Sequence, residues 1–440
     1  MVSEWREYRI GEIADIVGGS TPSTSDPSNF NGDIPWITPK DLSGPHDRYV
    51  SRGERNLSRK GLESCSAQLL PRGTVLVTSR APIGYVAIAK NPITTNQGFR
   101  NLVPKPGVDS EFLYYWVKAN IEELRRHASG STFQELTGTA LAQIRIRVPP
   151  LPEQRAIAHI LGTLDDKIEL NRRMSQTLEA MVRALFKAWF VDFEPVRAKM
   201  EGRWGRGQSL PGLPAHLYDL FPARLVDSKL GEIPEGWMIG KLGDVAENPR
   251  RGIQPNCIAP NTPYIALEHM PRRSIALFDW GTAEGVESNK FEFKKGEILF
   301  GKLRPYFHKV GVAPVDGVCS TDIVVIAPRQ HVWTAFVLGH VSSLEFVNYT
   351  NAGSSGTKMP RTSWGDMARY EIVLPPESVA ETFNTLVQPL IEQIISGIHE
   401  SRTLAALRDA LLPKLIRGEI RVKEVEQLVL QHVSNTQKED

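Results

Sequence analysis

The stretch that decides the fold runs from residue 149 to residue 190 and reads PPLPEQRAIAHILGTLDDKIELNRRMSQTLEAMVRALFKAWF. One line of residues recurs in it at intervals of seven, and a second, apolar line follows four positions behind. The first line is Ile157, Leu164, Asn171, Leu178 and Leu185, and the second is Leu161, Ile168 and Val182. A heptad stripe of this length, with charged residues between, is typical of a coiled-coil helix. We therefore predict one long helix whose seam contains the first line, with Asn171 fixing the register.

A second stretch of the same kind begins at Pro375-Pro376. Its predicted seam contains Ile391, Ile394, Ile398 and Leu412. Pro389 lies early in it, which predicts that the first turns are kinked or that the helix begins after this proline. An ordinary core helix is the alternative for each stretch, but such helices average only about 11–12 residues. The double prolines are offset by 375 − 149 = 226 residues, which indicates a duplicated chain.

The segments before the two helices match each other as well. IPWITPKDL (34–42) corresponds to TPYIALEHM (262–270), and RGTVLVTSRAPIGYVAIA (72–89) corresponds to KGEILFGKLRPYFHKVGVA (295–313). Each of the longer pair is typical of two strands joined by a polar loop. The predicted organisation is an α/β domain (1–148), a helix (149–193), a linker (194–229), a second α/β domain (230–374), a second helix (375–420) and a polar tail (421–440).

Composition excludes several classes of protein. The 440 residues have a net charge of +2, and charged residues interrupt every apolar run before it reaches membrane-spanning length. The N-terminus has no apolar segment typical of a signal peptide, and Cys65, Cys257 and Cys319 lie far apart, as expected of reduced thiols in a cytoplasm. The sequence contains no glycine-rich nucleotide loop and no cluster of metal ligands. We expect a cytoplasmic protein that binds no cofactor or metal and has no catalytic residues.

Basic residues gather in two clusters outside the predicted helices, one at Arg48 to Lys60 and one at Arg250 to Arg304. A single cluster usually indicates a solvated surface, but two clusters in matching halves favour binding of a polyanion. Polar loops beside the predicted hairpins contain residue types that can reach base edges or phosphates. For base contacts the candidates are Lys40, Ser79, Arg80, Asn96 and Gln97 in the first half and Lys302, Arg304, Tyr306 and Asp322 in the second. For phosphate contacts they are the loop residues Gly130, Ser131 and Thr132 in the first half and Gly356, Thr357 and Lys358 in the second.

Several blocks in a fixed order carry a resemblance to a known family. They are residues 149–174, LFKAWFVDFEPVRAK (185–199), LPAHLYDLFPARLVDSKLGEIPEGW (213–237), IPWITPKDL (34–42) and LLPKLIRGEI (411–420). Over nearly its whole length the chain resembles the specificity (S, HsdS) subunit of type I restriction-modification enzymes. It departs from the pattern at the second proline junction, which reads PPESVAE where the first reads PPLPEQRA.

The resemblance implies an α+β protein in which two tandem target recognition domains are joined by two long antiparallel helices with pseudo-two-fold symmetry. It also implies that each domain reads one half of a split target in double-stranded DNA. Two methyltransferase (M) subunits would bring S-adenosylmethionine and methylate adenine. Restriction (R) subunits would bring ATP and Mg²⁺ and cleave the DNA. The alternative functions are a methyltransferase or nuclease with its own recognition domain, and a coiled-coil adaptor that binds no DNA.

Overall fold

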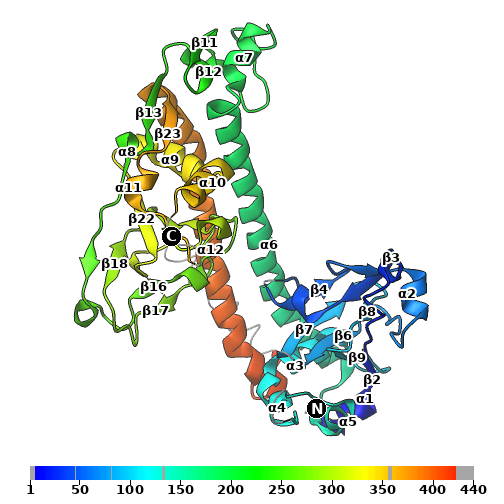
Figure 1. Ribbon diagram of the computed structural model, residues 1–440. Coiled ribbons are helices and arrows are strands. Elements are labelled where there is room, and N and C mark those ends of the chain that lie inside the picture. The colour runs from blue at the N-terminus through cyan, green and yellow to red at the C-terminus, as the bar shows by residue number, and fades with distance from the viewer. Residues whose placement is uncertain (1–4, 45, 81, 131–133, 355–358, 423–440) are drawn as a thin grey trace. The chain divides into compact units, whose positions relative to one another are not determined.

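A computed structural model of the chain describes residues 5–44, 46–80, 82–130, 134–354 and 359–422 (Figure 1). The chain divides into two compact units. The first comprises Met1–Glu169 together with Thr403–Asp440, and the second comprises Leu170–Arg402. Two long helices, α6 (Leu151–Phe190) and α12 (Glu377–Arg417), each contribute one part to the first unit and one part to the second.

The described residues of the first unit form three sheets. A five-stranded sheet has the order β2 (Ala14–Gly18), β9 (Arg100–Pro104), β6 (Val75–Ser79), β7 (Ile83–Ala89) and β4 (Tyr49–Val50). A three-stranded sheet has the order β5 (Asn56–Leu57), β3 (Phe30–Ile37) and β8 (Thr94–Thr95), and β1 (Arg6–Arg9) pairs antiparallel with β10 (Arg145–Val148). The short helices are α1 (Ile10–Ile13), α2 (Arg59–Glu63), α3 (Ser110–Ala119), α4 (Ile121–Arg126) and α5 (Gly138–Gln143).

Helix α3 packs between the five-stranded sheet and the parts of α6 and α12 that belong to the first unit. Asp109 caps it by accepting hydrogen bonds from the backbone N–H groups of Glu111 and Phe112. Its residues 112–117 are all buried, as expected of a helix covered on every side. They share one hydrophobic core with Ile157 and Leu161 of α6 and with Leu412 and Leu415 of α12, among others. The predicted seam residues Ile157 and Leu412 are therefore core residues of this unit.

The second unit repeats the combination of sheets and short helices. A four-stranded sheet has the order β14 (Ala246–Glu247), β22 (Ile323–Pro328), β19 (Ile298–Gly301) and β20 (Val310–Val312). A five-stranded sheet has the order β15 (Gly252–Ile253), β18 (Lys290–Phe293), β21 (Gly317–Cys319), β16 (Pro263–Ile265) and β17 (Gly281–Thr282). Two pairs complete the strands, β11 (Leu225–Ser228) with β12 (Gly231–Pro234) and β13 (Met238–Lys241) with β23 (Glu371–Leu374). The short helices are α7 (Glu194–Met200), α8 (Leu242–Val245), α9 (Thr334–Val341), α10 (Leu344–Ala352) and α11 (Trp364–Met367).

Aromatic side chains dominate the core of the second unit. Phe186 and Phe190 of α6 pack against Phe336 of α9 and Phe383 of α12, with ring centroids 4.8–6.4 Å apart. Gly339 of α9 permits this approach, because a Cβ there would lie 2.0 Å from the Phe186 ring. The segment at residues 194–229 adds Trp204, Leu213, Leu217 and Phe221 to the same core.

Within each unit the two long helices run antiparallel. In the second unit Asn171 and Phe186 of α6 meet Glu400 and Phe383 of α12, so the numbers fall along one helix as they rise along the other. In the first unit Asp165 pairs with Arg408. Asn171 is buried and donates hydrogen bonds to the Glu400 carboxylate and the Ser401 hydroxyl. Of the other predicted seam residues, Leu178, Ile391, Ile394 and Ile398 are buried, and Leu164 and Leu185 are partly buried.

Of the two outcomes predicted at Pro389, a helix that begins after this proline is wrong, and kinked first turns stay a prediction. The helix begins at Glu377 and includes Pro389. Proline at this position removes one backbone hydrogen bond, but Val379, Phe383 and Val387 are fully buried on the turns before it. Their burial stabilises those turns as helix. The predicted fold class is confirmed: the chain has two α/β units and two long antiparallel helices. The predicted domain boundaries, including those of the linker, stay predictions.

Candidate nucleic-acid interface

Three polar segments meet at one end of the β6–β7 hairpin in the first unit. The backbone N–H of Ser79, the last residue of β6, donates to the carbonyl of Gly98 at 2.8 Å. The carbonyl of Ser79 accepts from the N–H of Leu136 at 2.9 Å. Residues 79–80, 96–100 and 135–136 are far apart in sequence and lie side by side at this point. We call these segments the first loop cluster.

The second unit repeats this hydrogen-bond pattern at the end of the β19–β20 hairpin. The N–H of Lys302 donates to the carbonyl of Asp322 at 2.9 Å, and the N–H of Thr362 donates to the carbonyl of Lys302 at 3.1 Å. Residues 302–306, 320–322 and 359–362 therefore form a second loop cluster. The equivalent positions differ by 302 − 79 = 223, 322 − 98 = 224 and 362 − 136 = 226 residues. The duplication seen in the sequence thus extends to individual backbone hydrogen bonds.

Each loop cluster contains an ion pair between a carboxylate and arginine. In the first, Glu135 pairs with Arg100 at 2.8 Å and lies 3.8 Å from Arg80. In the second, Asp322 pairs with Arg361 at 3.3 Å. The side chains of Arg80 and Arg361 remain 39% and 54% exposed. Both guanidinium groups can therefore contact a ligand without leaving the cluster, and bidentate donation to guanine or to a phosphate is the chemistry that suits them.

The predicted DNA-binding residues of the first unit differ in exposure and in their hydrogen-bond partners. Asn96 lies in the first loop cluster, where its side chain accepts from the Gly98 N–H, and the exposed Gln97 accepts from the Thr21 hydroxyl. Lys40 lies on the short turn Pro39–Leu42 and pairs with Glu54 at 2.5 Å. Gly130 is exposed with φ 122°, a conformation that favours glycine. Ser79 is the exception, because its side chain is buried and its hydroxyl has no partner among the described residues. It cannot touch DNA without rearrangement of the loop.

The predicted residues of the second unit gather more closely. Lys302, Arg304, Tyr306 and Asp322 all belong to the second loop cluster. Arg304 adopts a left-handed conformation with φ 51°, and its N–H donates to the Pro360 carbonyl at 2.8 Å. Tyr306 is half exposed at the tip of the hairpin. Five other candidates, Ser131, Thr132, Gly356, Thr357 and Lys358, lie outside the residues that the structure describes.

The first basic cluster is divided between the surface, where Arg52, Arg55, Arg59 and Lys60 are exposed, and the interior, where Arg48 lies. Arg48 is buried and pairs with Asp166 at 2.8 Å. Lys60 pairs with Asp26, and the Arg55 guanidinium lies 3.9 Å from the centre of the Phe30 ring. The expectation that this run of cations binds a polyanion is therefore wrong for Arg48. The charge pattern of the sequence does not reveal the tertiary partners of Arg48.

Sequence reasoning missed three residues of the loop clusters, namely Arg100, Glu135 and Arg361. A signal for two of them was present. Glu135 and Arg361 are separated by 361 − 135 = 226 residues, the same offset as the double prolines. Each follows a Gly/Ser/Thr-rich loop that was itself singled out. Aligning the two halves at that offset places both positions beside the candidate loops.

Other kinds of site find no support in the described part of the chain. No group of three or more His, Cys, Asp or Glu side chains there is arranged to hold a metal ion. Among the helices that are described, none has the length and apolar character to cross a membrane. The three cysteines are free thiols, and burial raises the pKa of Cys319 to about 12, so this thiol stays protonated.

Comparisons with known proteins identify the family of the chain. Residues 2–180 match the family model of the type I restriction modification DNA specificity domain. The chain is 36% identical to the type I restriction enzyme MjaIX specificity subunit of Methanocaldococcus jannaschii, over 96% of this chain and 95% of that protein. It is 23% identical to the HindI specificity subunit of Haemophilus influenzae, over 95% of this chain and the whole of that protein. The crystal structure of a type I S subunit from M. genitalium has the same fold, with a TM-score of 0.57, 15% identity and coverage of 94% and 96% of the two chains. The chain belongs to the specificity subunits of type I restriction enzymes, which recognise DNA and are not themselves catalytic.

Proposed function

We propose that this specificity subunit reads a split target in double-stranded DNA, with one half-site read by each of its two α/β units. The observation that carries the proposal is the repeated loop cluster. Two copies of one backbone hydrogen-bond pattern present different side chains, Arg80 and Glu135 in the first and Lys302, Asp322 and Arg361 in the second. A shared frame with different side chains is the arrangement that gives two domains different base preferences.

The side chains divide into two proposed roles. Arg80, Asn96, Gln97, Arg304 and Arg361 are exposed or partly exposed residues of types that bond guanine or adenine edges, and we assign them to base readout. Lys40, Lys302, Tyr306 and the Gly/Ser/Thr loops beginning at Gly130 and Gly353 are assigned to phosphates, which fix the register on the duplex. Ser79 is left out because it is buried. Asp322 orients Arg361 through their ion pair.

Catalysis belongs to other subunits in this proposal. Two M subunits carry S-adenosylmethionine and methylate adenine within the recognised site. R subunits use ATP and Mg²⁺ to cleave unmodified DNA. The complex works on DNA in the cytoplasm. What supports this division is membership of the specificity family, whose members recognise DNA for the restriction enzyme.

Reconstitution tests the proposal. The purified chain, its cognate M subunits and the combination of both are incubated with genomic DNA and labelled S-adenosylmethionine. The combination should methylate adenine at one two-part sequence, and the chain alone should transfer no methyl group. Methyl transfer by the chain alone would favour the alternative, a methyltransferase with its own recognition domain. Methylation at a continuous sequence would contradict reading by halves.

A further inference from the structure

Helix α6 contains two carboxylates that are buried against other elements. The side chain of Asp165 is 13% exposed and that of Glu179 is 4% exposed. Acidic side chains are rarely buried unless charged or polar partners compensate them. Asp165 belongs to the first unit and Glu179 to the second. The partners of each carboxylate lie mostly on the α/β part of its own unit.

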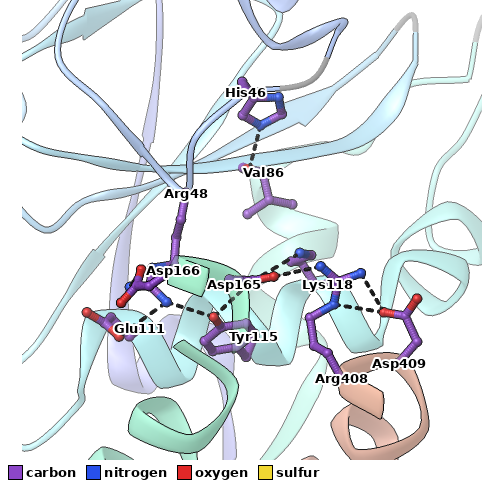
Figure 2. A network of polar contacts seen from close by, with 10 residues as sticks. All are labelled: His46, Arg48, Val86, Glu111, Tyr115, Lys118, Asp165, Asp166, Arg408 and Asp409. Atoms are coloured by element: carbon purple, nitrogen blue, oxygen red, sulfur yellow. Dashed lines mark hydrogen bonds and ion pairs between the residues drawn. The ribbon is translucent and has the colours of Figure 1, made fainter. Parts of the chain in front are cut away.

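Asp165 joins three elements of the first unit (Figure 2). It accepts from the Tyr115 hydroxyl of α3 at 2.8 Å and from Arg408 of α12 at 2.6 Å, and Lys118 of α3 lies 3.9 Å away. Arg48 extends the network, because one of its nitrogens donates to the Tyr115 oxygen and another to Asp166, each at 2.8 Å. The α/β part and both long helices are therefore connected by directional bonds.

Two further observations show that this network is built into the fold. Gly162 of α6 leaves room for the Arg48 guanidinium, since a Cβ at residue 162 would lie 2.5 Å from an Arg48 nitrogen. Burial opposes ionisation of Asp165, but the charge of Lys118 and the hydrogen bonds from Arg408 and Tyr115 outweigh burial and lower its pKa. The carboxylate is therefore ionised at neutral pH and accepts all of these bonds.

A chain of contacts leads from this network to the first loop cluster. The backbone carbonyl of Arg48 accepts from the N–H of Ile88, which lies on β7. Strand β7 pairs with β6 along the hairpin that ends at Ser79 and Arg80. Arg48 is thus joined to this hairpin by one backbone hydrogen bond.

Glu179 makes an equivalent connection in the second unit. It accepts from the Ser274 hydroxyl at 2.6 Å and from the Ala276 N–H at 3.1 Å. Arg183, one turn further along α6, donates to Glu179 at 2.8 Å and to the Arg273 carbonyl at 2.9 Å. The segment at 273–276 is therefore fixed to α6.

This segment also leads to a loop cluster. The carbonyl of Ile275 accepts from the N–H of Val312 on β20 at 2.9 Å. Strand β20 pairs with β19, which ends at Gly301, directly before Lys302. In the second unit Glu179 is thus connected to the residues proposed to contact DNA through the segment at 273–276 and one hairpin. In the first unit the connection from Asp165 is longer and runs through Tyr115, Arg48, one backbone hydrogen bond and the β6–β7 hairpin.

Apolar packing and these polar bonds have different consequences. The hydrophobic core of each unit includes residues of its α/β part and of the long helices, so removing a carboxylate leaves that core in place. Apolar contacts have little directional preference, whereas hydrogen bonds to a buried carboxylate hold only in one geometry. The carboxylates therefore affect orientation more than association.

We propose that Asp165 and Glu179 are positioning residues, each of which fixes the orientation of one recognition domain on α6 and so sharpens the reading of one half-site. This inference rests on the proposed reading of one half-site by each domain. In this inference α6 contains two residues, each of which affects the specificity of a different recognition domain.

The test uses Asp165→Asn and Glu179→Gln, each assembled with the M subunits. Glu392→Gln is the matched control, because Glu392 is exposed on α12 and accepts from Gln388 of the same helix. Methylation is measured on the cognate duplex, on duplexes with one altered base pair in the half-site of the first domain, and on duplexes altered in the other half-site. An altered base pair usually lowers affinity by about 5- to 150-fold. We expect Asp165→Asn to reduce this discrimination at least about threefold in the first half-site only, and Glu179→Gln in the second only.

Two milder variants keep the inference testable if Asp165→Asn or Glu179→Gln fails to fold. Tyr115→Phe removes one donor to Asp165, and Ser274→Ala removes one donor to Glu179. They should show the same selectivity with smaller effects. Equal losses in both half-sites, or unchanged discrimination in all four variants, would overturn the inference. If the wild-type complex recognises no two-part sequence, the proposed function itself fails, and that result is visible before any variant is measured.

Discussion

His340 should make the second unit sensitive to acid. It lies on α9 with 9% of its surface exposed, and its ring centre is 4.6 Å from that of Phe336 and 4.9 Å from that of Phe186. Its Nε2 has no partner among the described residues. Burial alone lowers the pKa of His340 from 6.5 to about 3. The imidazole is therefore neutral in the folded protein and becomes protonated when the unit unfolds below pH 6.5.

The sign and size of the effect follow from this shift. Because the folded pKa is below the unfolded value, stability is fully present above pH 6.5 and falls as the pH decreases from 6.5 toward 3. At pH 5 the unfolded state gains about 2 kcal/mol from protonation of this one residue, while the folded state gains almost nothing. A loss of this size is a substantial part of the stability of a typical domain.

The comparison of wild type with His340→Leu measures this contribution. Leucine has a similar volume and no titrating group, so any packing cost should be the same at pH 7 and at pH 5. Urea titrations read by pulsed hydrogen exchange in peptides from α9 give the stability of the second unit separately from the first. Subtracting the two proteins cancels the other titrating groups. We expect wild type to lose about 2 kcal/mol more than the variant between pH 7 and pH 5.

Parallel loss in the two proteins would refute the reasoning. It would show that His340 becomes protonated in the folded state at pH 5 at little cost. A histidine that is buried among aromatic rings would then have to find a hydrogen-bond partner that the described residues do not provide.

Two further predictions concern the recognition domains. Arg80→Ala and Lys302→Ala distinguish a base contact from a phosphate contact. Arg80→Ala should cost about 1–3 kcal/mol of discrimination at one base pair. Lys302→Ala should weaken binding to cognate and scrambled duplexes alike and reduce the slope of log affinity against log salt concentration by about one. Titrations of both duplexes at several salt concentrations check this, and equal losses on both duplexes for Arg80→Ala would move it to the phosphate contacts. Gly162→Ala should displace Arg48 and destabilise the first unit by about 1–3 kcal/mol, which peptide-resolved hydrogen exchange measures; unchanged exchange in α3 would contradict it.

The long helices and the duplication could be predicted because both are repeated patterns. The heptad line through Asn171 and the 226-residue offset depend only on spacing in the sequence. The alternative that α12 begins after Pro389 is wrong because the local cost of this proline is visible in the sequence, whereas the burial of Phe383 that outweighs it depends on tertiary packing.

The candidate site was predictable in kind but not in detail. Loops beside the hairpins were identified from their polar residues, and the structure brings several of them together. The partner of an arginine, however, depends on contacts across more than a hundred residues of sequence, as with Arg48 and Asp166. Whether a loop residue is exposed depends on the same packing, so the burial of Ser79 and the exposure of Arg361 could not be predicted from the sequence.

The exchange of one domain tests the central claim most directly. Residues 1–148 are replaced by the matching residues of a relative that recognises a different target, and the chimera is expressed with the M subunits in cells that lack other methyltransferases. Sequencing of the methylated DNA should show that one half-site has changed to that of the relative while the other half-site is the same as before. Changes in both half-sites, or in neither, would contradict the reading of one half-site by each domain.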